Sequence, residues 1–169
     1  MSKAAPFRVA LLDASHDRAS FDSDSAALNR YLQQQATQDV RRRITACFVA
    51  VPGDNLQCIA GYYTLASSSV LLHDLPVAPG KKLLRYPSVP VVRMGRLAVA
   101  KAFNGVGLGA ALLADALGRA VRAEIAAYAL VVDAKDDFAA SFYRHHGFIA
   151  MPSTPLTLFL PLANVKELA

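Results

Sequence analysis

The sequence of 169 residues has only two cysteines and four histidines, and it lacks any long apolar run. The spacing of these cysteines and histidines fits no zinc-binding pattern, so we predict no metal site. No apolar run reaches the ~18 to 20 residues of a membrane-spanning helix, and the apolar stretch near the N-terminus is too short for a signal peptide. No G-x-x-x-x-G-K-S/T segment, repeat or low-complexity linker occurs. The sequence therefore excludes a zinc protein, a membrane-spanning protein and a P-loop nucleotide-binding protein.

The remaining composition is that of one folded domain. Hydrophobic residues make up 54% of the chain and its mean hydropathy is +0.29, which excludes a disordered chain. A chain of this length can bury a full hydrophobic core. We therefore expect a single domain spanning residues 1–169, with no membrane partner and a cytoplasmic location.

The two cysteines, Cys47 and Cys58, flank the turn signal Pro52-Gly-Asp-Asn55. In a hairpin centred on that turn they stand nearly opposite each other. Two buried thiols are the usual arrangement in a cytosolic protein, and a redox pair is the alternative interpretation.

The net charge of +5 is unevenly distributed. Residues 41–101 contain nine Lys or Arg and two Asp, a net charge of +7, so the rest of the chain carries −2. Three tyrosines among these charges, Tyr62, Tyr63 and Tyr86, allow stacking on an exposed base. The asymmetry favours a polyanionic partner, although a solvated basic surface has the same composition. The nine basic residues are Arg41, Arg42, Arg43, Lys81, Lys82, Arg85, Arg93, Arg96 and Lys101.

The hydrophobic pattern predicts a mixed α/β order of elements. A strand at residues 7–12 precedes a helix over residues 23–38, which is capped by Asp22 or Ser23. The inward face of that helix consists of Ala27, Leu28, Tyr31 and Leu32. Further strands are expected at residues 45–51, 57–66, 67–72, 89–99, 127–132, 148–151 and 157–160.

Residues 73–88 contain three prolines and are expected to form an irregular loop. This loop is the best candidate for a substrate-binding flap, because it carries Lys81, Lys82 and Arg85. In the strand that follows, Arg93 and Arg96 alternate to opposite faces unless a bulge intervenes.

A glycine-rich loop, residues 104–109, connects the strand at residues 89–99 to a helix. A helix that opens directly from such a loop aims its first unpaired N–H groups and the positive end of its dipole at the loop, which predicts a phosphate-binding site. A loose G-x-G-x-x-A dinucleotide pattern, with Glu124 about 20 residues on, is one alternative, and a purely structural turn is another. One face of the helix consists of Gly109, Leu112, Leu113, Ala116, Leu117, Ala120 and Val121, and the opposite face carries Asp115, Arg119 and Arg122.

A third helix is expected to begin at Asp136 and Asp137, where acidic residues suit the helix dipole, and to end at Gly147. Tyr143 shares its inward face and carries a hydroxyl that needs a partner. The other inward residues are Phe138, Ala139 and Phe142.

Two ordered blocks resemble the signature of the GCN5-related N-acetyltransferases, the GNAT family. The first, Leu97-Ala-Val followed by Asn104-Gly-Val-Gly-Leu-Gly, is similar to the acetyl-CoA motif Q/R-x-x-G-x-G/A after a strand. Because loop amides bind most of the pyrophosphate in such a site, we expect the departure at Asn104 to weaken the site without abolishing it. The second, Ala139-Ala-Ser-Phe-Tyr-Arg-His-His-Gly-Phe, resembles the family's A-x-x-F/L-Y-x-x-x-G-F and follows Asp136, where the family commonly has Asn.

Four further segments resemble one branch of this family, the toxin acetyltransferases of type II toxin–antitoxin pairs. They are Phe21-Asp-Ser, Gly61-Tyr-Tyr-Thr-Leu-Ala, Pro90-Val-Val-Arg-Met-Gly-Arg-Leu-Ala-Val and Pro155-Leu-Thr-Leu-Phe-Leu-Pro-Leu, in the expected order along the chain. The resemblance implies the GNAT fold, a twisted, mostly antiparallel sheet flanked by about four helices, with a bulge in the strand at residues 89–99. It also implies acetyl-CoA as donor, a bacterial cytoplasm, a homodimer, and a ribbon-helix-helix antitoxin whose tail masks the basic face.

In the resembled family, backbone N–H groups at the end of the signature strand hold the carbonyl oxygen of the thioester. Tyr143 would then donate to the leaving sulfur. A phenol near pKa 10 faces a thiol near 8.5, so hydrogen bonding to the sulfur matters as much as full protonation. A core tyrosine bonded to backbone is the alternative. The cofactor-binding residues implied are Leu97, Ala98, Val99, Asn104, Gly105, Val106, Gly107, Leu108, Gly109, Ala110 and Phe142.

No Glu or His stands out as a general base. A lysine acceptor, with a pKa near 10.4, needs one, whereas an α-amino group near 7.7 to 8.0 is already largely neutral. The ester of an aminoacyl-tRNA carries such an amine on a polyanion, so we hypothesise that the protein acetylates aminoacyl-tRNA and arrests translation. Arg93 and Arg96 are the candidates at the acceptor end, and the residues further along the RNA would be Arg41, Arg42, Arg43, Lys81, Lys82 and Arg85. An acetyltransferase of small amines or protein N-termini, and a non-enzymatic nucleic-acid-binding module, are the alternatives.

Overall fold

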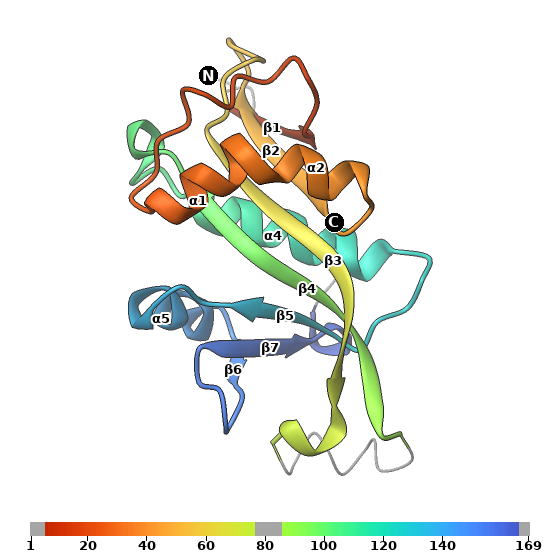
Figure 1. The fold of residues 1–169 in the computed structure, drawn as a ribbon. Coiled ribbons are helices and arrows are strands. Elements are labelled where there is room, and N and C mark those ends of the chain that lie inside the picture. Colours follow the sequence, from red (N-terminus) through yellow and green to blue (C-terminus); the bar gives the residue numbers. More distant parts are fainter. Residues whose placement is uncertain (1–5, 77–85, 166–169) are drawn as a thin grey trace. The chain divides into compact units, whose positions relative to one another are not determined.

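The computed structural model of the protein describes residues 6–76 and 86–165, so the predicted flap residues Lys81, Lys82 and Arg85 lie outside the described residues (Figure 1). The strands are β1 (Phe7–Leu11), β2 (Ala46–Pro52), β3 (Gly61–Leu71), β4 (Ser88–Val99), β5 (Ala129–Asp133), β6 (Ile149–Ala150) and β7 (Thr157–Pro161). The α-helices are α1 (Ala26–Arg30), α2 (Ala36–Arg41), α4 (Leu108–Arg122) and α5 (Asp137–His145). A π-helical segment, Tyr31–Gln35, joins α1 to α2, and short 3-10 turns occur at Leu72–Asp74, Lys101–Phe103 and Leu162–Asn164.

The strands form one sheet in the order β1-β2-β3-β4-β5-β7-β6. β4 and β5 are parallel, whereas the pairs β1–β2, β2–β3, β5–β7 and β6–β7 are antiparallel. The predicted mixed α/β fold with a mostly antiparallel sheet is therefore confirmed. No helix within the described ranges is long and apolar enough to cross a membrane.

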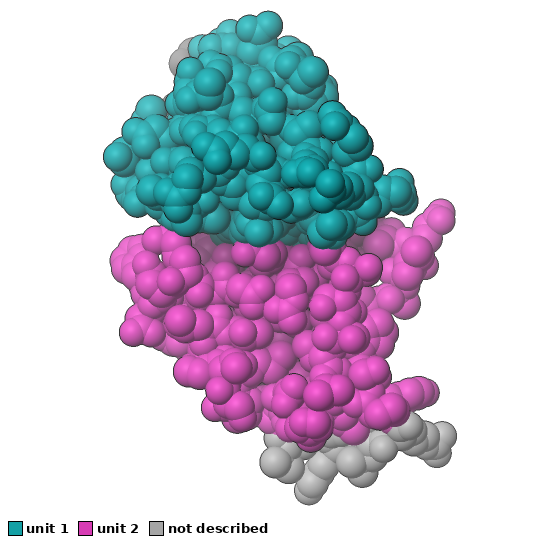
Figure 2. Space-filling view, viewed as in Figure 1, with its two compact units in different colours: residues 1–65, 96–116 teal, residues 66–95, 117–169 magenta. Residues whose placement is uncertain are grey.

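The chain divides into two compact units (Figure 2). Unit 1 comprises residues 1–65 and 96–116, and unit 2 comprises residues 66–95 and 117–169. β3, β4 and α4 each contribute one part to either unit. The expectation of a single domain over residues 1–169 stays a prediction.

The first helical region begins later than the sequence suggests. Helix α1 starts at Ala26 and its N-cap is Ser25, whose hydroxyl accepts a hydrogen bond from the Leu28 N–H at 3.2 Å. The predicted caps, Asp22 and Ser23, lie before the helix and are therefore wrong. The Ser23 hydroxyl instead donates to the side-chain oxygen of an asparagine within α1, at 2.7 Å, which leaves Ser25 to cap the helix.

The predicted inward face of this region is partly right. Tyr31 and Leu32 are buried and Leu28 packs against them, but Ala27 is exposed. The difference arises at the π-helical segment, where the N–H of Ala36 donates to the Tyr31 carbonyl five residues back. This wider turn rotates the buried face relative to a regular α-helix.

A single long strand, β3, replaces the two strands expected at residues 57–66 and 67–72. No Gly or Pro interrupts the sequence between residues 62 and 71, so nothing breaks the ladder of backbone hydrogen bonds there. The register places Cys47 opposite Thr64, so the expectation that the two cysteines stand opposite each other is wrong, and of the two thiols expected to be buried only Cys47 is, since Cys58 is half-buried. Both thiols are free, and burial raises the pKa of Cys47 to about 12, as expected for an unreactive core thiol.

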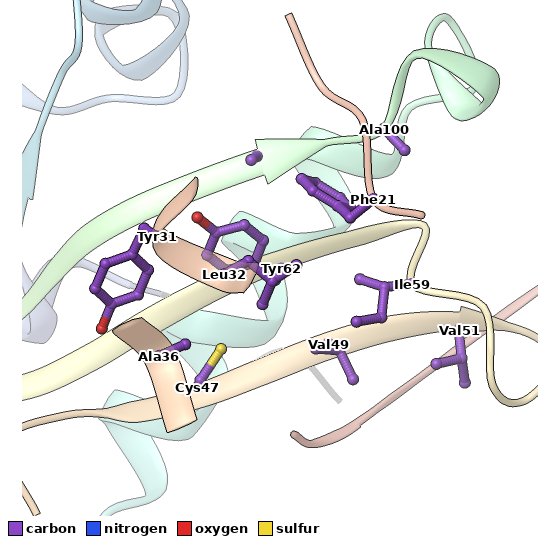
Figure 3. Packing of buried hydrophobic residues seen from close by; sticks show 11 residues of the cluster. Phe21, Tyr31, Leu32, Ala36, Cys47, Val49, Val51, Ile59, Tyr62 and Ala100 are labelled. Carbon is purple, nitrogen blue, oxygen red and sulfur yellow. The ribbon is translucent and has the colours of Figure 1, made fainter. Parts of the chain in front are cut away.

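The core of unit 1 forms where α1, the π-helical segment and α2 pack on β2 and β3 (Figures 1 and 3). The Phe21 ring meets the Tyr62 ring edge-on with centroids 5.4 Å apart, and the Tyr62 hydroxyl donates to the Leu28 carbonyl at 2.7 Å. Because Tyr62 and Tyr63 are 0% exposed, neither can stack on an RNA base, whereas Tyr86 is exposed. The buried cluster consists of Phe21, Tyr31, Leu32, Ala36, Cys47, Val49, Val51, Ile59, Tyr62, Ala98 and Ala100.

Gly61 allows three elements of unit 1 to approach one another closely. A Cβ atom at this position would lie 2.9 Å from the Ala98 carbonyl oxygen on β4 and 2.9 Å from Leu112 Cδ1 on α4. Two residues along β3, the Tyr63 hydroxyl donates to the Asp115 carboxylate on α4. β3 thus fixes both the end of β4 and the first half of α4, the two elements that flank the glycine-rich loop.

Replacing Gly61 with alanine is expected to destabilise the protein by about 1–3 kcal/mol, because the added methyl group overlaps a backbone carbonyl that cannot move alone. Thermal denaturation should show a fall in Tm of roughly 3–10 °C. Gly118→Ala is the matched control, because its Cβ would meet only the flexible guanidinium of Arg122. An unchanged Tm for Gly61→Ala would show that β3 and β4 can separate at this point without cost.

In unit 2, α5 packs beside β7, and a second hydrophobic core surrounds β5 and β7 (Figure 1). Ala140 and Tyr143 are the buried residues of α5, whereas Phe138 is 84% exposed, so the prediction that Phe138 faces inward is wrong. Phe138 lies about 140° from Tyr143 around the helix axis, so its ring points away from the buried side of α5. The second core consists of Val70, Leu75, Val89, Val91, Ala129, Val131, Met151 and Phe159.

Candidate functional site

The glycine-rich loop has the backbone geometry that its sequence predicts. Gly105 has a φ of +79° and Gly107 a φ of +81°, both in the left-handed region that favours glycine. Helix α4 begins at Leu108, and the Ala111 N–H donates to the Gly107 carbonyl at 3.1 Å. The N–H groups of Leu108, Gly109 and Ala110 therefore precede the hydrogen-bond ladder of α4, where they have no intrahelical acceptor. The start of α4 thus presents unpaired backbone N–H groups at the positive end of the helix dipole.

The side chains of the loop leave this backbone accessible. Val106 is 64% exposed and Asn104 is also exposed, whereas Leu108 is buried and anchors the first turn of α4. A Cβ atom added at Gly105 or Gly107 would have no heavy atom of the described chain within 4 Å. Any cost of a larger residue there comes from the backbone conformation and from the loss of access to the loop amides, and not from crowding.

The predicted buried face of α4 is confirmed, but Asp115, which is predicted on the opposite face, accepts a hydrogen bond from the buried Tyr63. Leu112, Leu113, Ala116 and Ala120 are buried, and Arg122 on the opposite face is exposed.

The strand end before the loop is firmly anchored within unit 1. Ala98 is buried in the core cluster, and the Ala100 N–H donates to the Ala60 carbonyl at 2.8 Å. The Lys101 N–H donates to the Asp22 carbonyl at 2.8 Å. The register of β4 with β5 covers Val91–Met94, so among the described residues the last part of β4, including residues 97–99, extends beyond its β5 partner. The predicted bulge in β4 stays a prediction.

Tyr143 lies on α5 in unit 2 and is only 4% exposed. Its ring contacts Phe142, with centroids 5.3 Å apart, and Phe148, with centroids 5.6 Å apart. Burial, and to a lesser degree the charge of Asp133, raise the pKa of Tyr143 well above its usual value. Its hydroxyl forms no hydrogen bond within residues 6–76 and 86–165, so the alternative of a backbone-bonded core tyrosine finds no support there. Tyr143 is therefore a neutral phenol whose hydroxyl can donate a hydrogen bond.

Phe142 is half-buried between Tyr143 and His146, whose ring centroid lies 4.8 Å from that of Phe142. The helix that carries both residues is capped by Asp136, whose carboxylate accepts a hydrogen bond from the Ala139 N–H at 2.8 Å. This bond and the hydrogen bond from Lys135 lower the pKa of Asp136. Asp136 therefore performs the capping that an Asn would perform, and the departure from the family pattern leaves the helix start intact.

Arg93 is engaged within unit 2. Its Nη1 contacts both carboxylate oxygens of Asp133, at 2.8 and 3.0 Å, and its Nε lies 3.5 Å from the Ser68 hydroxyl oxygen. The Thr157 hydroxyl also donates to Asp133. To bind an RNA phosphate, Arg93 must give up its contact with Asp133. The sequence did not indicate this contact, because Asp133 is 40 residues away.

Arg96 has a different environment, in unit 1. Its guanidinium carbon lies 3.4 Å from the centroid of the Tyr31 ring, and the Tyr31 hydroxyl donates to the buried carboxylate of Asp39 at 2.8 Å. Among the described residues Arg96 has neither an ion pair nor a hydrogen bond to a side chain. The sequence predicted Arg96 as a substrate contact but Tyr31 only as a core residue, and it did not single out Asp39.

The Arg41-Arg-Arg43 segment ends the first helical region, as predicted, and all three residues are exposed. Arg43 has a φ of +60°, the only positive φ of a non-glycine residue in the described chain. Its N–H donates to the Val40 carbonyl at 3.0 Å, and the Ile44 N–H donates to the Asp39 carbonyl at 2.9 Å. These two bonds form a Schellman C-cap, in which the Arg43 position usually holds glycine.

Replacing Arg43 with glycine is expected to raise the free energy of unfolding by up to about 1 kcal/mol, because glycine adopts a positive φ without the strain of a Cβ atom. If Arg43 binds RNA, the same change should raise KM for a charged tRNA roughly threefold, as one phosphate contact is lost. Denaturant unfolding and steady-state kinetics measure the two effects. A variant that is more stable with an unaltered KM would assign Arg43 to capping alone.

The predicted residues therefore fall into two groups. Unit 1 holds the strand end, the glycine-rich loop, Arg96 and the Arg41-Arg-Arg43 segment, and unit 2 holds Tyr143, Phe142 and Arg93. Across the described part of the chain, no cluster of three or more His, Cys, Asp or Glu side chains is arranged to hold a metal ion.

Comparisons with known proteins identify relatives over almost the whole chain. Residues 84–157 match the model of the acetyltransferase (GNAT) domain. Over 168 residues the chain is 37% identical to a tRNA-acetylating toxin of Mycobacterium tuberculosis, an alignment that covers 98% of this chain and 96% of that protein.

Solved structures of similar proteins show the same fold. AtaT complexed with acetyl-methionyl-tRNAfMet has a TM-score of 0.86 and 29% sequence identity, covering 93% of this chain and 95% of that chain. A tyrosine-to-phenylalanine mutant of AtaT, bound to the C-terminus of the antitoxin AtaR and to acetyl-CoA, has a TM-score of 0.78 and 27% identity, covering 93% of this chain and 94% of that chain.

Proposed function

The chain belongs to the GNAT acetyltransferases, and within them to the tRNA-acetylating toxins, and we propose that it transfers an acetyl group from acetyl-CoA to the α-amino group of an aminoacyl-tRNA. Acetylation of that amine blocks its use in peptide-bond formation, so the protein acts as a translation-arresting toxin. The observation that carries this proposal is the 37% identity to a tRNA-acetylating toxin across 98% of the chain.

The glycine-rich loop fits the pyrophosphate of acetyl-CoA. The N–H groups of Leu108, Gly109 and Ala110 at the positive end of α4 suit its negative charge, and Gly105 and Gly107 give it access to the loop backbone. Asn104 and Val106 in the glycine-rich loop have exposed side chains, and Phe142 on α5 is the proposed apolar contact for acetyl-CoA. Acetyl-CoA supplies the acetyl group as a thioester.

The end of β4 and Tyr143 supply the chemical contributions of the protein. The backbone N–H groups of Leu97 and Val99 polarise the thioester carbonyl, because this part of β4 extends beyond its pairing with β5, whereas the N–H of Ala98, like that of Ala100, faces β3. The amine forms a bond to the carbonyl carbon while the bond from that carbon to sulfur breaks. The proton of the amine passes to water, and the Tyr143 hydroxyl donates its proton to the departing sulfur.

The acceptor amine requires little activation. An aminoacyl ester has an α-amino group with a pKa near the ordinary 7.7 to 8.0, so much of it is neutral at physiological pH. This fits a site in which the described residues include a proton donor, Tyr143, but no carboxylate or imidazole with the features of a general base.

The basic residues are proposed to hold the RNA. Arg96 is the best placed to contact the acceptor end, because no carboxylate of the described chain neutralises it. Arg93 joins it only by exchanging Asp133 for a phosphate. Residues further along the RNA are Arg41, Arg42 and Arg43, together with Lys81, Lys82 and Arg85 of the predicted flap.

The partners follow from the same branch of the family. The AtaT structures include complexes with the antitoxin AtaR and with an acetylated aminoacyl-tRNA. We extend this to an antitoxin of the ribbon-helix-helix type, to a homodimer and to a bacterial cytoplasmic location.

The test is transfer of labelled acetyl groups from acetyl-CoA to bulk charged tRNA, with uncharged tRNA and a lysine-rich protein as parallel acceptors. Label on charged tRNA alone, with a rate that falls steeply as salt rises, is the expected result. Label only on protein or small amines, with little dependence on salt, would overturn the proposed substrate while keeping the acetyl donor.

A further inference from the structure

Four residues of unit 1 form a polar cluster around Arg96: Tyr31 and Gln35 of the π-helical segment, Asp39 of α2, and Arg96 itself on β4. Tyr31 is central in this cluster. One face of its ring supports the Arg96 guanidinium carbon at 3.4 Å, and its hydroxyl donates to Asp39 Oδ2 at 2.8 Å. Figure 3 shows Tyr31 within the core cluster, together with Leu32 and Ala36.

The Asp39 carboxylate is hydrogen-bonded to Tyr31 and not to Arg96. It is 9% exposed, its Oδ2 accepts from Tyr31, and its Oδ1 accepts from Gln35 Nε2 at 3.4 Å. In the described chain no salt bridge joins Asp39 to Arg96. Burial of a carboxylate is costly unless it is compensated, and an ion pair is one common way to compensate it. Here two hydrogen bonds compensate it, and the positive charge of Arg96 stays un-neutralised.

The π-helical segment makes this arrangement possible. Residues eight positions apart in a regular α-helix lie about 80° apart around its axis, too far for Tyr31 to reach Asp39 from the same face. The five-residue hydrogen bond from Ala36 to Tyr31 widens one turn and reduces that angle. Such segments occur frequently at functional sites. The helix therefore departs from regular geometry at the residue that supports Arg96.

Arg96 is held in one place with its hydrogen-bonding capacity unused. The guanidinium stacks through its face, while its N–H groups, which lie in the guanidinium plane, have no side-chain acceptor among the described residues. A planar fork of N–H donors, immobilised on an aromatic ring, matches the two non-bridging oxygens of a phosphodiester.

We propose that Tyr31 and Asp39 are positioning residues that hold the Arg96 guanidinium for a phosphodiester of the tRNA acceptor end, an inference that rests on the proposed function. Asp39 fixes the rotation of the Tyr31 ring through the hydroxyl, and the ring fixes the guanidinium. Loss of the hydroxyl both frees the ring and releases Asp39, whose carboxylate can then turn to Arg96 and neutralise it.

The test measures kcat and KM for a charged tRNA, together with the Kd for acetyl-CoA. Arg96→Gln is expected to raise KM for the tRNA about tenfold and to reduce the salt dependence of log KM by about 0.7. Tyr31→Phe keeps the ring but removes the hydroxyl, and should raise KM about fivefold, with kcat and the Kd for acetyl-CoA within about twofold of the wild type. Asp39→Ala removes the acceptor of the Tyr31 hydroxyl and should raise KM about as much as Tyr31→Phe, whereas Asp39→Asn, which retains an accepting oxygen, should restore most of that loss.

Tyr62→Phe is the matched control. Tyr62 belongs to the same core cluster and its hydroxyl also has a single partner, the Leu28 carbonyl, but no arginine lies on its ring. It should share any general loss of stability with Tyr31→Phe while leaving KM unchanged. The double variant Tyr31→Phe, Arg96→Gln should have the KM of Arg96→Gln alone, since the tyrosine acts only through the arginine.

Three outcomes would overturn the inference: an unchanged KM in Tyr31→Phe, an equal rise in Tyr62→Phe, or additive effects in the double variant. Failure of the proposed function is a separate result, because it would appear as an absence of label on charged tRNA with the wild-type protein. Acetyl-CoA binding, measured by calorimetry, reports folding of every variant without reference to RNA.

Discussion

Replacing Tyr143 with phenylalanine is expected to reduce kcat by about 100-fold or more, the usual contribution of a positioned proton donor. The buried phenol has a raised pKa and no hydrogen-bond partner within the described chain, so it remains protonated and free to donate to the leaving sulfur. Removal of a hydroxyl without a protein partner leaves no unsatisfied group behind, so the fold should be retained. The loss is therefore expected in kcat, while the Kd for acetyl-CoA stays within about twofold of the wild-type value.

The measurement is single-turnover transfer to charged tRNA, paired with calorimetric titration of acetyl-CoA. Tyr128→Phe, a half-buried tyrosine of the same unit, controls for the loss of a hydroxyl as such. The pH profile adds a second readout. Because burial raises the pKa of Tyr143, kcat should not fall from its deprotonation at or below the ordinary tyrosine value of about 10. Full activity in Tyr143→Phe would remove this residue from the proton transfer.

Replacing Gly107 with valine is expected to weaken acetyl-CoA binding roughly 100-fold or more. Gly107 has a φ of +81°, a conformation that a β-branched residue adopts only at considerable cost. Relief of that strain turns the peptide planes of the loop and displaces the N–H groups at the start of α4. Because no heavy atom lies within 4 Å of the added Cβ, the valine side chain itself does not clash, and the core should remain folded.

Calorimetric titration of acetyl-CoA, with circular dichroism to monitor the fold, tests this expectation. Gly118→Ala, within the same helix but outside the loop, should bind acetyl-CoA normally. Gly107→Ala should lie between the wild type and Gly107→Val, because alanine tolerates a positive φ better than valine does. Wild-type affinity in Gly107→Val would mean that the loop amides do not hold the pyrophosphate.

The elements with strong local signals are predictable from sequence. The apolar repeat of α4 and the glycines before it place that helix to within a residue. Asp136 indicates the start of α5, because a carboxylate is a strong N-cap. β4 follows from its many apolar and β-branched residues, although Arg93, Gly95 and Arg96 interrupt the run. The glycine-rich loop is also predictable, because a left-handed backbone conformation strongly favours glycine.

The rest depends on contacts between distant residues. The Asp133 partner of Arg93 comes from another strand, and the Tyr31 support of Arg96 comes from another element altogether, so no local pattern signals either. The cap at Ser25 is chosen over Ser23 because Ser23 bonds to an asparagine six residues on. Phe138 is exposed despite its apolar side chain. The way α5 packs on the sheet, and not the hydropathy of the residue, decides which face of the helix is covered.

The π-helical segment is also expected to leave a trace in sequence comparison. A helix with one five-residue hydrogen bond contains one residue more than a regular α-helix between the same two ends. In a regular helix, residues seven positions apart share a face, so a homologue without the π segment would keep the aromatic residue and the acidic residue on one face with a spacing of seven, not the eight that separates Tyr31 from Asp39. A one-residue gap inside this helix, placed between those two positions, would then mark an evolutionary insertion or deletion and not an error of alignment.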